Sequence, residues 1–173
     1  WVSLASETMD IPVTLAVDRT DDAVVTGCTS AANDCTLRGA LLMASAGSSS
    51  IAFDAAVFDP ASPGTIVVTS PLPAIAVDNV SVVGNYETDA SVGVIIDGTN
   101  AGIGVDGLVI TGSNNAVRGL QIQNFDGDGL VIDGGASNQI GGATGCDFEG
   151  GAILVNNGGY GFVVRGESAD ANV

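Results

Sequence analysis

From residue 50 onward, hydrophobic residues come in short runs that are each closed by glycine, asparagine or a polar residue. Each run holds three to five β-branched or aliphatic residues, as in TIVVTS (65–70), VIIDG (94–98) and GLVITG (107–112). Runs of this length and composition predict short β-strands, and the residues between them predict tight turns. Because these turns are too short for crossover helices, the pattern favours an all-β fold.

Several of the runs recur. GLVITG at 107–112 returns as GLVIDG at 129–134, which is 22 residues later, and IQNFDGDGLVIDG at 122–134 matches LVNNGGYGFVVRG at 154–166. A repeat of about 22 residues built from short strands and turns is typical of solenoids, since one such unit cannot bury its apolar face alone. The spacing therefore predicts a parallel β-helix. Asn79, Asn115 and Asn138 each precede an apolar strand start and predict a hydrogen-bonded asparagine ladder.

The first 49 residues have a different pattern. Residues 11–17 alternate between apolar and polar, which predicts a strand, and TLRGALLMASAG at 36–47 predicts a helix. Asp34 is the expected N-cap of this helix and Gly47 the residue that ends it. We expect residues 1–49 to supply a strand and a capping helix, and residues 50–173 to supply the coils of the same structural domain.

The segment CTLRGAL at 35–41 resembles the Cys-Ser-Leu-Arg-Glu-Ala segment of many secreted or cell-surface bacterial right-handed β-helix proteins, with Thr36 for Ser and Gly39 for Glu. Further matches in the same order, such as IVVTSPLPAI (66–75) and DGLVIDGGASNQIGG (128–142), extend the resemblance over roughly residues 13–166. The resemblance implies a pectate-lyase-like right-handed parallel β-helix, here of roughly five coils, whose N-terminal opening is closed by the helix. Because such folds carry many functions, the resemblance does not define an activity.

Composition excludes many functions. The chain has 173 residues and a formal net charge of −16, because 20 Asp and Glu residues stand against four arginines, with no lysine or histidine. Such an acidic surface repels phosphate backbones and anionic lipids, so we expect no nucleic-acid partner. No stretch approaches the roughly 18 consecutive apolar residues of a transmembrane helix, so we expect no membrane insertion. Without histidine and lysine, the chain lacks Ser-His-Asp catalysis, Schiff-base chemistry and phosphate-loop nucleotide binding.

Cysteine usage bears on location. Cys28 and Cys35 enclose the short polar loop TSAAND, a spacing that favours a local disulfide over two reduced, buried thiols. Cys146 is left over, either as a buried small residue or as a free or intermolecular thiol. The disulfide and the abundance of small polar residues indicate a secreted, extracellular or cell-surface protein.

Candidate chemistry is confined to carboxylates. Asp126 and Asp128 in FDGDG are the only candidates for an acid and base pair on polysaccharide, and with Asp106 and Asp133 they form a predicted acidic column. Carboxylate oxygens in such a column can bind Ca²⁺. The competing interpretation, which we favour, is that these are ordinary turn residues, with no cofactor and no catalysis.

The sequence therefore favours a non-enzymatic structural module that acts in adhesion, surface display or self-assembly into fibres. The predicted assembly segment is the β-prone N-terminus, which could add to a neighbour's sheet through Trp1, Val2, Leu4, Ile11 and Val13. Two alternatives stay open: residues 1–12 are a loose lead-in or pair within their own chain, or the chain is a fragment of a longer solenoid. The partners would be further copies at the ends of the coils, or glycans. The alternative is a carbohydrate-active lyase or hydrolase, or a carbohydrate-binding module.

Overall fold

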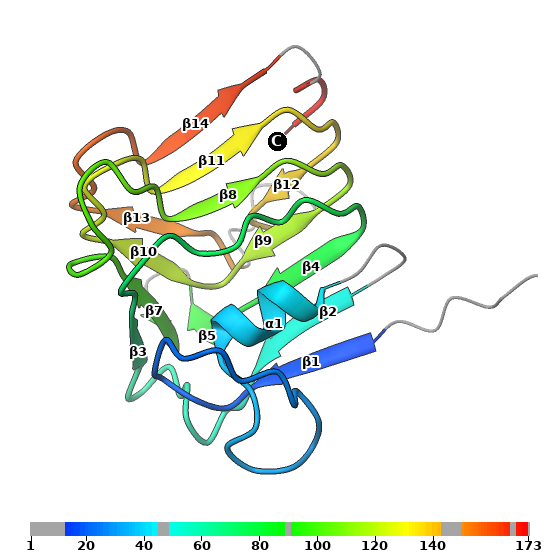
Figure 1. Cartoon of the computed structure of the whole chain (residues 1–173), viewed down its shortest axis with the longest axis vertical. Coiled ribbons are helices and arrows are strands. Elements are labelled where there is room, and N and C mark those ends of the chain that lie inside the picture. The colour runs from blue at the N-terminus through cyan, green and yellow to red at the C-terminus, as the bar shows by residue number, and fades with distance from the viewer. Residues whose placement is uncertain (1–12, 45–48, 89–90, 143–149, 167–168, 173) are drawn as a thin grey trace, which may run out of the picture.

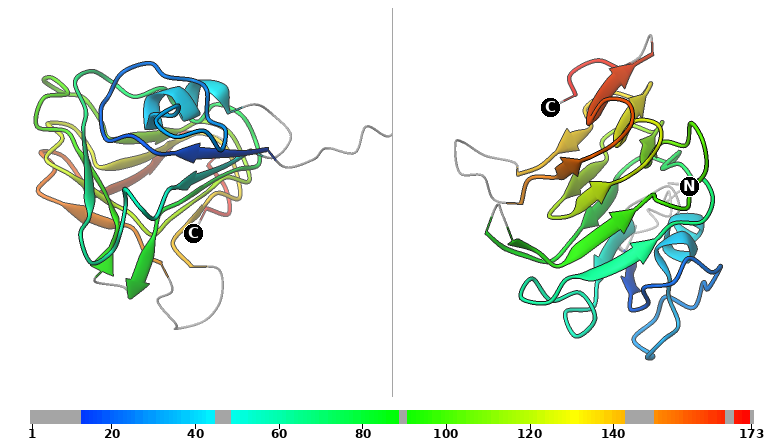
Figure 2. Two further views of the ribbon diagram at one scale, coloured as in Figure 1. Left: turned by 90° about the horizontal axis from the view of Figure 1, so that it is seen from below. Right: turned by 90° about the vertical axis from the view of Figure 1, so that its left-hand side faces the viewer.

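The computed structural model describes residues 13–44, 49–88, 91–142, 150–166 and 169–172. Strands dominate these residues, and they form three short parallel sheets around one core, with one helix at one end (Figures 1 and 2). The five-stranded sheet contains, in order, β1 (Val13–Val17), β2 (Ser49–Phe53), β4 (Val80–Val83), β9 (Ala116–Arg118) and β12 (Gln139–Ile140). The four-stranded sheet contains β13 (Ile153–Val155), β10 (Gln121–Gln123), β7 (Val94–Asp97) and β3 (Gly64–Val67). The three-stranded sheet contains β14 (Phe162–Arg165), β11 (Leu130–Asp133) and β8 (Leu108–Ile110), and β5 (Tyr86–Thr88) and β6 (Ser91–Val92) form a separate antiparallel pair.

The β-branched runs form strands because alternate side chains enter the core. In β8, Leu108 and Ile110 are fully buried and Val109 between them is only partly buried. Parallel register places like residues in columns, so that Leu108 pairs with Leu130 and Ile110 with Ile132. These columns of Leu, Ile and Val fill the space between the three sheets.

The predicted right-handed parallel β-helix of roughly five coils is wrong. The strands form three short sheets of unequal size, with five, four and three members, instead of a regular solenoid. The predicted period of about 22 residues is wrong for the whole chain because it holds for only one part of it. Leu108 pairs with Leu130 at an offset of 22 residues, whereas Val13 pairs with Ser49, 36 residues later. Connections of such different length cannot build identical coils.

The helix α1 (Leu37–Met43) closes one end of the core, beside β1 (Figure 1). Its N-cap is Thr36, whose hydroxyl accepts a hydrogen bond from the Gly39 N–H at 3.0 Å. The predicted N-cap, Asp34, is wrong because its carboxylate instead accepts from the N–H and hydroxyl of Thr29. A side chain at Gly39 would collide with the Val25 carbonyl, so this position of the helix requires glycine. The predicted helix end, Gly47, lies outside the described residues.

An asparagine ladder stabilises the starts of strands in the five-stranded sheet. The Oδ1 of Asn115 accepts from the Val80 N–H at 2.7 Å, and the Oδ1 of Asn138 accepts from the Asn115 N–H at 2.9 Å. Asn172 continues the series, because its Oδ1 accepts from the Asn138 N–H at 2.7 Å. The ladder is therefore present, but Asn172 belongs to it in place of the predicted Asn79. Asn79 has a positive φ of 63° and donates its N–H to Ser113.

Candidate functional site: two apolar ends, a groove and an acidic cluster

The inner columns of the three-stranded sheet end on side chains that are exposed. Phe162 of β14 continues the column of Leu108 and Leu130, and Val164 continues that of Ile110 and Ile132. The buried members are fully enclosed, whereas Phe162 is 41% and Val164 44% exposed. These two side chains, together with the exposed Tyr160, form what we call the open end.

The open end also includes the edges of sheets. Among the described residues β12, β13 and β14 are each the last strand of their sheet, so one edge of each has no strand beside it. Edge strands with unpaired N–H and C=O groups and apolar side chains are templates for pairing with another chain. An apolar cross-section of the core and free strand edges therefore occur at the same place.

The opposite end is closed by α1 and by the segment that precedes it. Arg38 of α1 makes a bidentate pair with Asp22, with Nε–Oδ1 at 2.9 Å and Nη2–Oδ2 at 2.8 Å. The same guanidinium donates to the carbonyls of Ser70 and Pro71, and the Asp22 carboxylate also accepts from the Thr69 N–H and hydroxyl. We call α1 and the segment between β1 and α1 the cap. This network joins the cap to residues 69–71, which follow β3.

A disulfide joins Cys28 and Cys35 within the cap, as the spacing predicted. Cys35 is fully buried, and its N–H donates to the Asp18 carboxylate at 2.9 Å. The third cysteine, Cys146, lies outside the described residues.

The cap exposes three large apolar side chains. The inner face of α1 buries Leu37, Ala40 and Leu41, while Leu42 and Met43 point away from the core and are 53% and 48% exposed. We call these two side chains and the exposed Val24 the cap face. The spacing of Leu37, Leu41 and Leu42 predicts one apolar face for this helix, which is wrong for Leu42 because it lies exposed in the last turn of a helix of only seven residues.

The predicted assembly segment lies mostly outside the described residues, which exclude Trp1, Val2, Leu4 and Ile11. Val13, the remaining predicted residue, begins β1 and is exposed. β1 is the edge strand of the five-stranded sheet at the capped end, and β12 is the edge strand at the other. The two strands run in the same direction, since every pairing between them is parallel.

Three of the four predicted acidic residues surround one arginine. The guanidinium of Arg165 lies 3.2 Å from Asp133, 3.6 Å from Asp106 and 3.9 Å from Asp128. Asp106 also accepts from the Asp128 N–H at 2.8 Å, and Asp128 from the Tyr160 N–H at 2.7 Å. Within the part of the chain that the structure describes, no group of three or more acidic, Cys or His side chains is arranged to hold a metal. Sequence reasoning did not place Arg165 here, although Arg165 occupies the position in GFVVRG that Asp133 occupies in GLVIDG and the two residues are strand partners.

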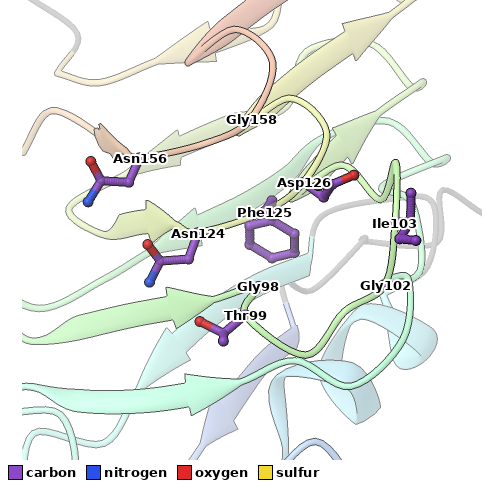
Figure 3. Close-up of a pocket in the computed structure, with 9 residues that line it drawn as sticks. All are labelled: Gly98, Thr99, Gly102, Ile103, Asn124, Phe125, Asp126, Asn156 and Gly158. Carbon is purple, nitrogen blue, oxygen red and sulfur yellow. The ribbon is translucent and has the colours of Figure 1, made fainter.

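The fourth predicted acid, Asp126, lies elsewhere. It lines a shallow groove of about 660 Å³ together with Asn124, Asn156 and Ile103, and its carboxylate accepts from the Gly104 N–H at 2.7 Å (Figure 3). Asp128 does not line this groove. Of the predicted acid and base pair, Asp126 therefore lines the groove, whereas Asp128 contacts Arg165.

Asp97 lies at the end of β7, beside the groove residues Thr99 and Asn124. Burial raises the pKa of Asp97, but hydrogen bonds from Thr99, Gln123 and Asn124 lower it by more, so the pKa lies below its usual 3.8. The carboxylate is therefore ionised at neutral pH and holds the Asn124 amide in place. A groove with two nearby carboxylates and outward amides suits neutral, hydroxyl-rich ligands better than anionic ones.

Comparison of the chain with protein-family models, with curated proteins and with solved structures finds no match. The resemblance of residues 35–41 to secreted bacterial proteins therefore stays a prediction. Among the described residues, no helix is long and apolar enough to cross a membrane.

Proposed function

We propose that the chain is a non-enzymatic structural module of a secreted or cell-surface protein, and that it associates with further copies of itself. The observation that carries this proposal is the open end, where the core columns finish on exposed Phe162 and Val164. Covering such side chains contributes about 25 cal/mol for each Å² of apolar surface removed from water. An adjoining copy would remove this surface and pair the free edges.

Charge opposes this association at low salt. Each copy carries a formal charge of −16, and like charges repel over a distance of about 30 Å at 0.01 M salt but only about 8 Å at 0.15 M. Assembly is therefore expected to strengthen as salt is added, until the charges are screened.

Sedimentation velocity over a range of protein and salt concentrations tests the proposal, with negative-stain electron microscopy of the same samples. We expect species heavier than the 17.0 kDa single chain, in amounts that rise with both concentrations. Phe162→Asp should reduce association, and Ile103→Asp is the matched control because Ile103 is 96% exposed, lines the groove and is not one of the three residues of the open end. A wild-type chain that stays monomeric throughout would overturn the proposal.

The groove supports a second candidate, the binding of a neutral glycan. Asn124 and Asn156 directly follow the adjacent strands β10 and β13, whose last residues, Gln123 and Val155, are paired, and their amides lie along the same side of the groove (Figure 3). Side-chain amides donate and accept hydrogen bonds, which suits sugar hydroxyls. Retention on an array of neutral glycans that is lost in Asn156→Leu would support this candidate, and no retention at all would exclude it.

A further inference from the structure

We infer that association is head-to-tail, with the open end of one copy docked on the cap face of the next. This inference rests on the proposed self-association and names the surface on the second copy that receives Phe162 and Val164. It follows from three observations, on the distribution of exposed apolar side chains, the position of the two surfaces and the polarity of the sheets.

Exposed large hydrophobic side chains concentrate at the two ends. Of the nine such side chains in the described residues, three form the cap face and three form the open end, and Val13 lies on β1 beside the cap. Only Val67 and Ile103 lie elsewhere. An isolated exposed side chain is ordinary, but exposed apolar groups that occur mainly at the two ends of the molecule indicate two interaction surfaces.

The two surfaces lie at opposite ends of the molecule. In Figure 1, α1 and β1 are at one end of the stacked strands and β14 is at the other. One copy can therefore engage two neighbours at once. A symmetric tail-to-tail dimer would cover the open ends and leave Leu42 and Met43 in water, whereas head-to-tail docking covers both surfaces.

Strand polarity is also compatible with stacking in one direction. β1 and β12 are the two edges of the same parallel sheet, so moving a copy along the stack brings its β1 beside the β12 of its neighbour with the strands still parallel. No inversion of the copy is needed. Contacts of this heterologous type do not close on themselves unless the rotation between copies forms a ring, and they otherwise give open filaments.

Two variants that each remove one surface test the inference directly. Leu42→Asp removes the cap face and leaves the open end, and Phe162→Asp does the reverse. We expect each variant alone to sediment as a 17.0 kDa monomer, and an equimolar mixture to give a species of twice that mass. The mixture has one intact cap face and one intact open end, so growth stops at two chains. Ile103→Asp should assemble like the wild type.

Each other outcome is decisive. Self-association of Leu42→Asp alone would show tail-to-tail contact, and self-association of Phe162→Asp alone would show cap-to-cap contact; both overturn the inference. A mixture that stays monomeric overturns it as well. Met43→Asp and Tyr160→Asp provide second variants on each surface, and far-UV circular dichroism confirms that every variant is folded. A monomeric wild type would instead overturn the proposed self-association itself.

Discussion

Replacing Arg38 with methionine should weaken the fold more than any other loss of a charged side chain in the cap. Arg38 and Asp22 are 11% and 3% exposed, and the guanidinium also donates to two backbone carbonyls at 2.8 Å. Arg38→Met keeps the aliphatic stem but leaves the Asp22 carboxylate buried, with Thr69 as its described partner. Breaking a buried pair in this way costs about 3–5 kcal/mol.

Thermal unfolding followed by circular dichroism measures this loss. For a chain of this size, 3–5 kcal/mol corresponds to a decrease in Tm of roughly 6–20 °C. Arg19→Met is the matched control, because Arg19 and Asp21 form a pair whose side chains are 33% and 45% exposed. Exposed pairs contribute about 0–1 kcal/mol, so this control should change Tm only slightly.

A double variant separates the buried charge from the lost contacts. Asp22→Asn combined with Arg38→Met removes the unpaired carboxylate while an amide oxygen can still accept from Thr69, so at least half of the lost stability should return. The reasoning is refuted if Arg38→Met lowers stability no more than Arg19→Met does. It is also refuted if the double variant loses as much stability as Arg38→Met and Asp22→Asn lose together.

Three further predictions concern other stabilising groups. Cys35→Ser should lower the free energy of unfolding by about 2–3 kcal/mol, given the sequence separation of seven between the bridged cysteines, and an unchanged Tm after reduction of the wild type would contradict this. Asn138→Ala should lower the free energy of unfolding, measured by urea denaturation, by about 2–4 kcal/mol, because two buried backbone groups lose their partners. This loss should exceed that of Asn172→Ala, since Asn172 is more exposed. Asp97 has a lowered pKa, so its ionised form contributes stability above pH 3.8 that is lost as the pH falls below that value. The difference in Tm between wild type and Asp97→Asn should accordingly shrink on acidification, and a difference independent of pH would argue against it.

Local patterns in the sequence predicted the elements well. Alternation over residues 11–17 corresponds to β1, the Leu- and Ala-rich segment to α1, and the Cys-x₆-Cys spacing to the disulfide. These features succeed because each depends on neighbours close in the chain, where propensity and spacing act directly. The ladder members Asn115 and Asn138 were predictable for the same reason, since each stands at a fixed place before its strand.

The arrangement of the strands was not predictable in the same way. The repeats within residues 107–166 predict one period for the whole chain, but the offset between paired strands depends on connections that vary in length, such as the segment between β1 and β2. The position of Arg165 among the acidic residues was not predictable for a related reason. Nothing near Asp106 or Asp128 in the sequence indicates Arg165, because the three meet only through strand pairing.

The range of the strand pairings has a consequence for the order of folding. Strands in the three parallel sheets pair with partners between 22 and 36 residues away, so no such pairing joins the beginning of the chain to its far end. Each new strand can add to one that already exists as soon as the intervening residues have emerged. The cap lies early in the sequence and is stabilised by the Arg38 network and the disulfide. It would then form first, and later strands would pair onto it in the order in which they are synthesised or exported.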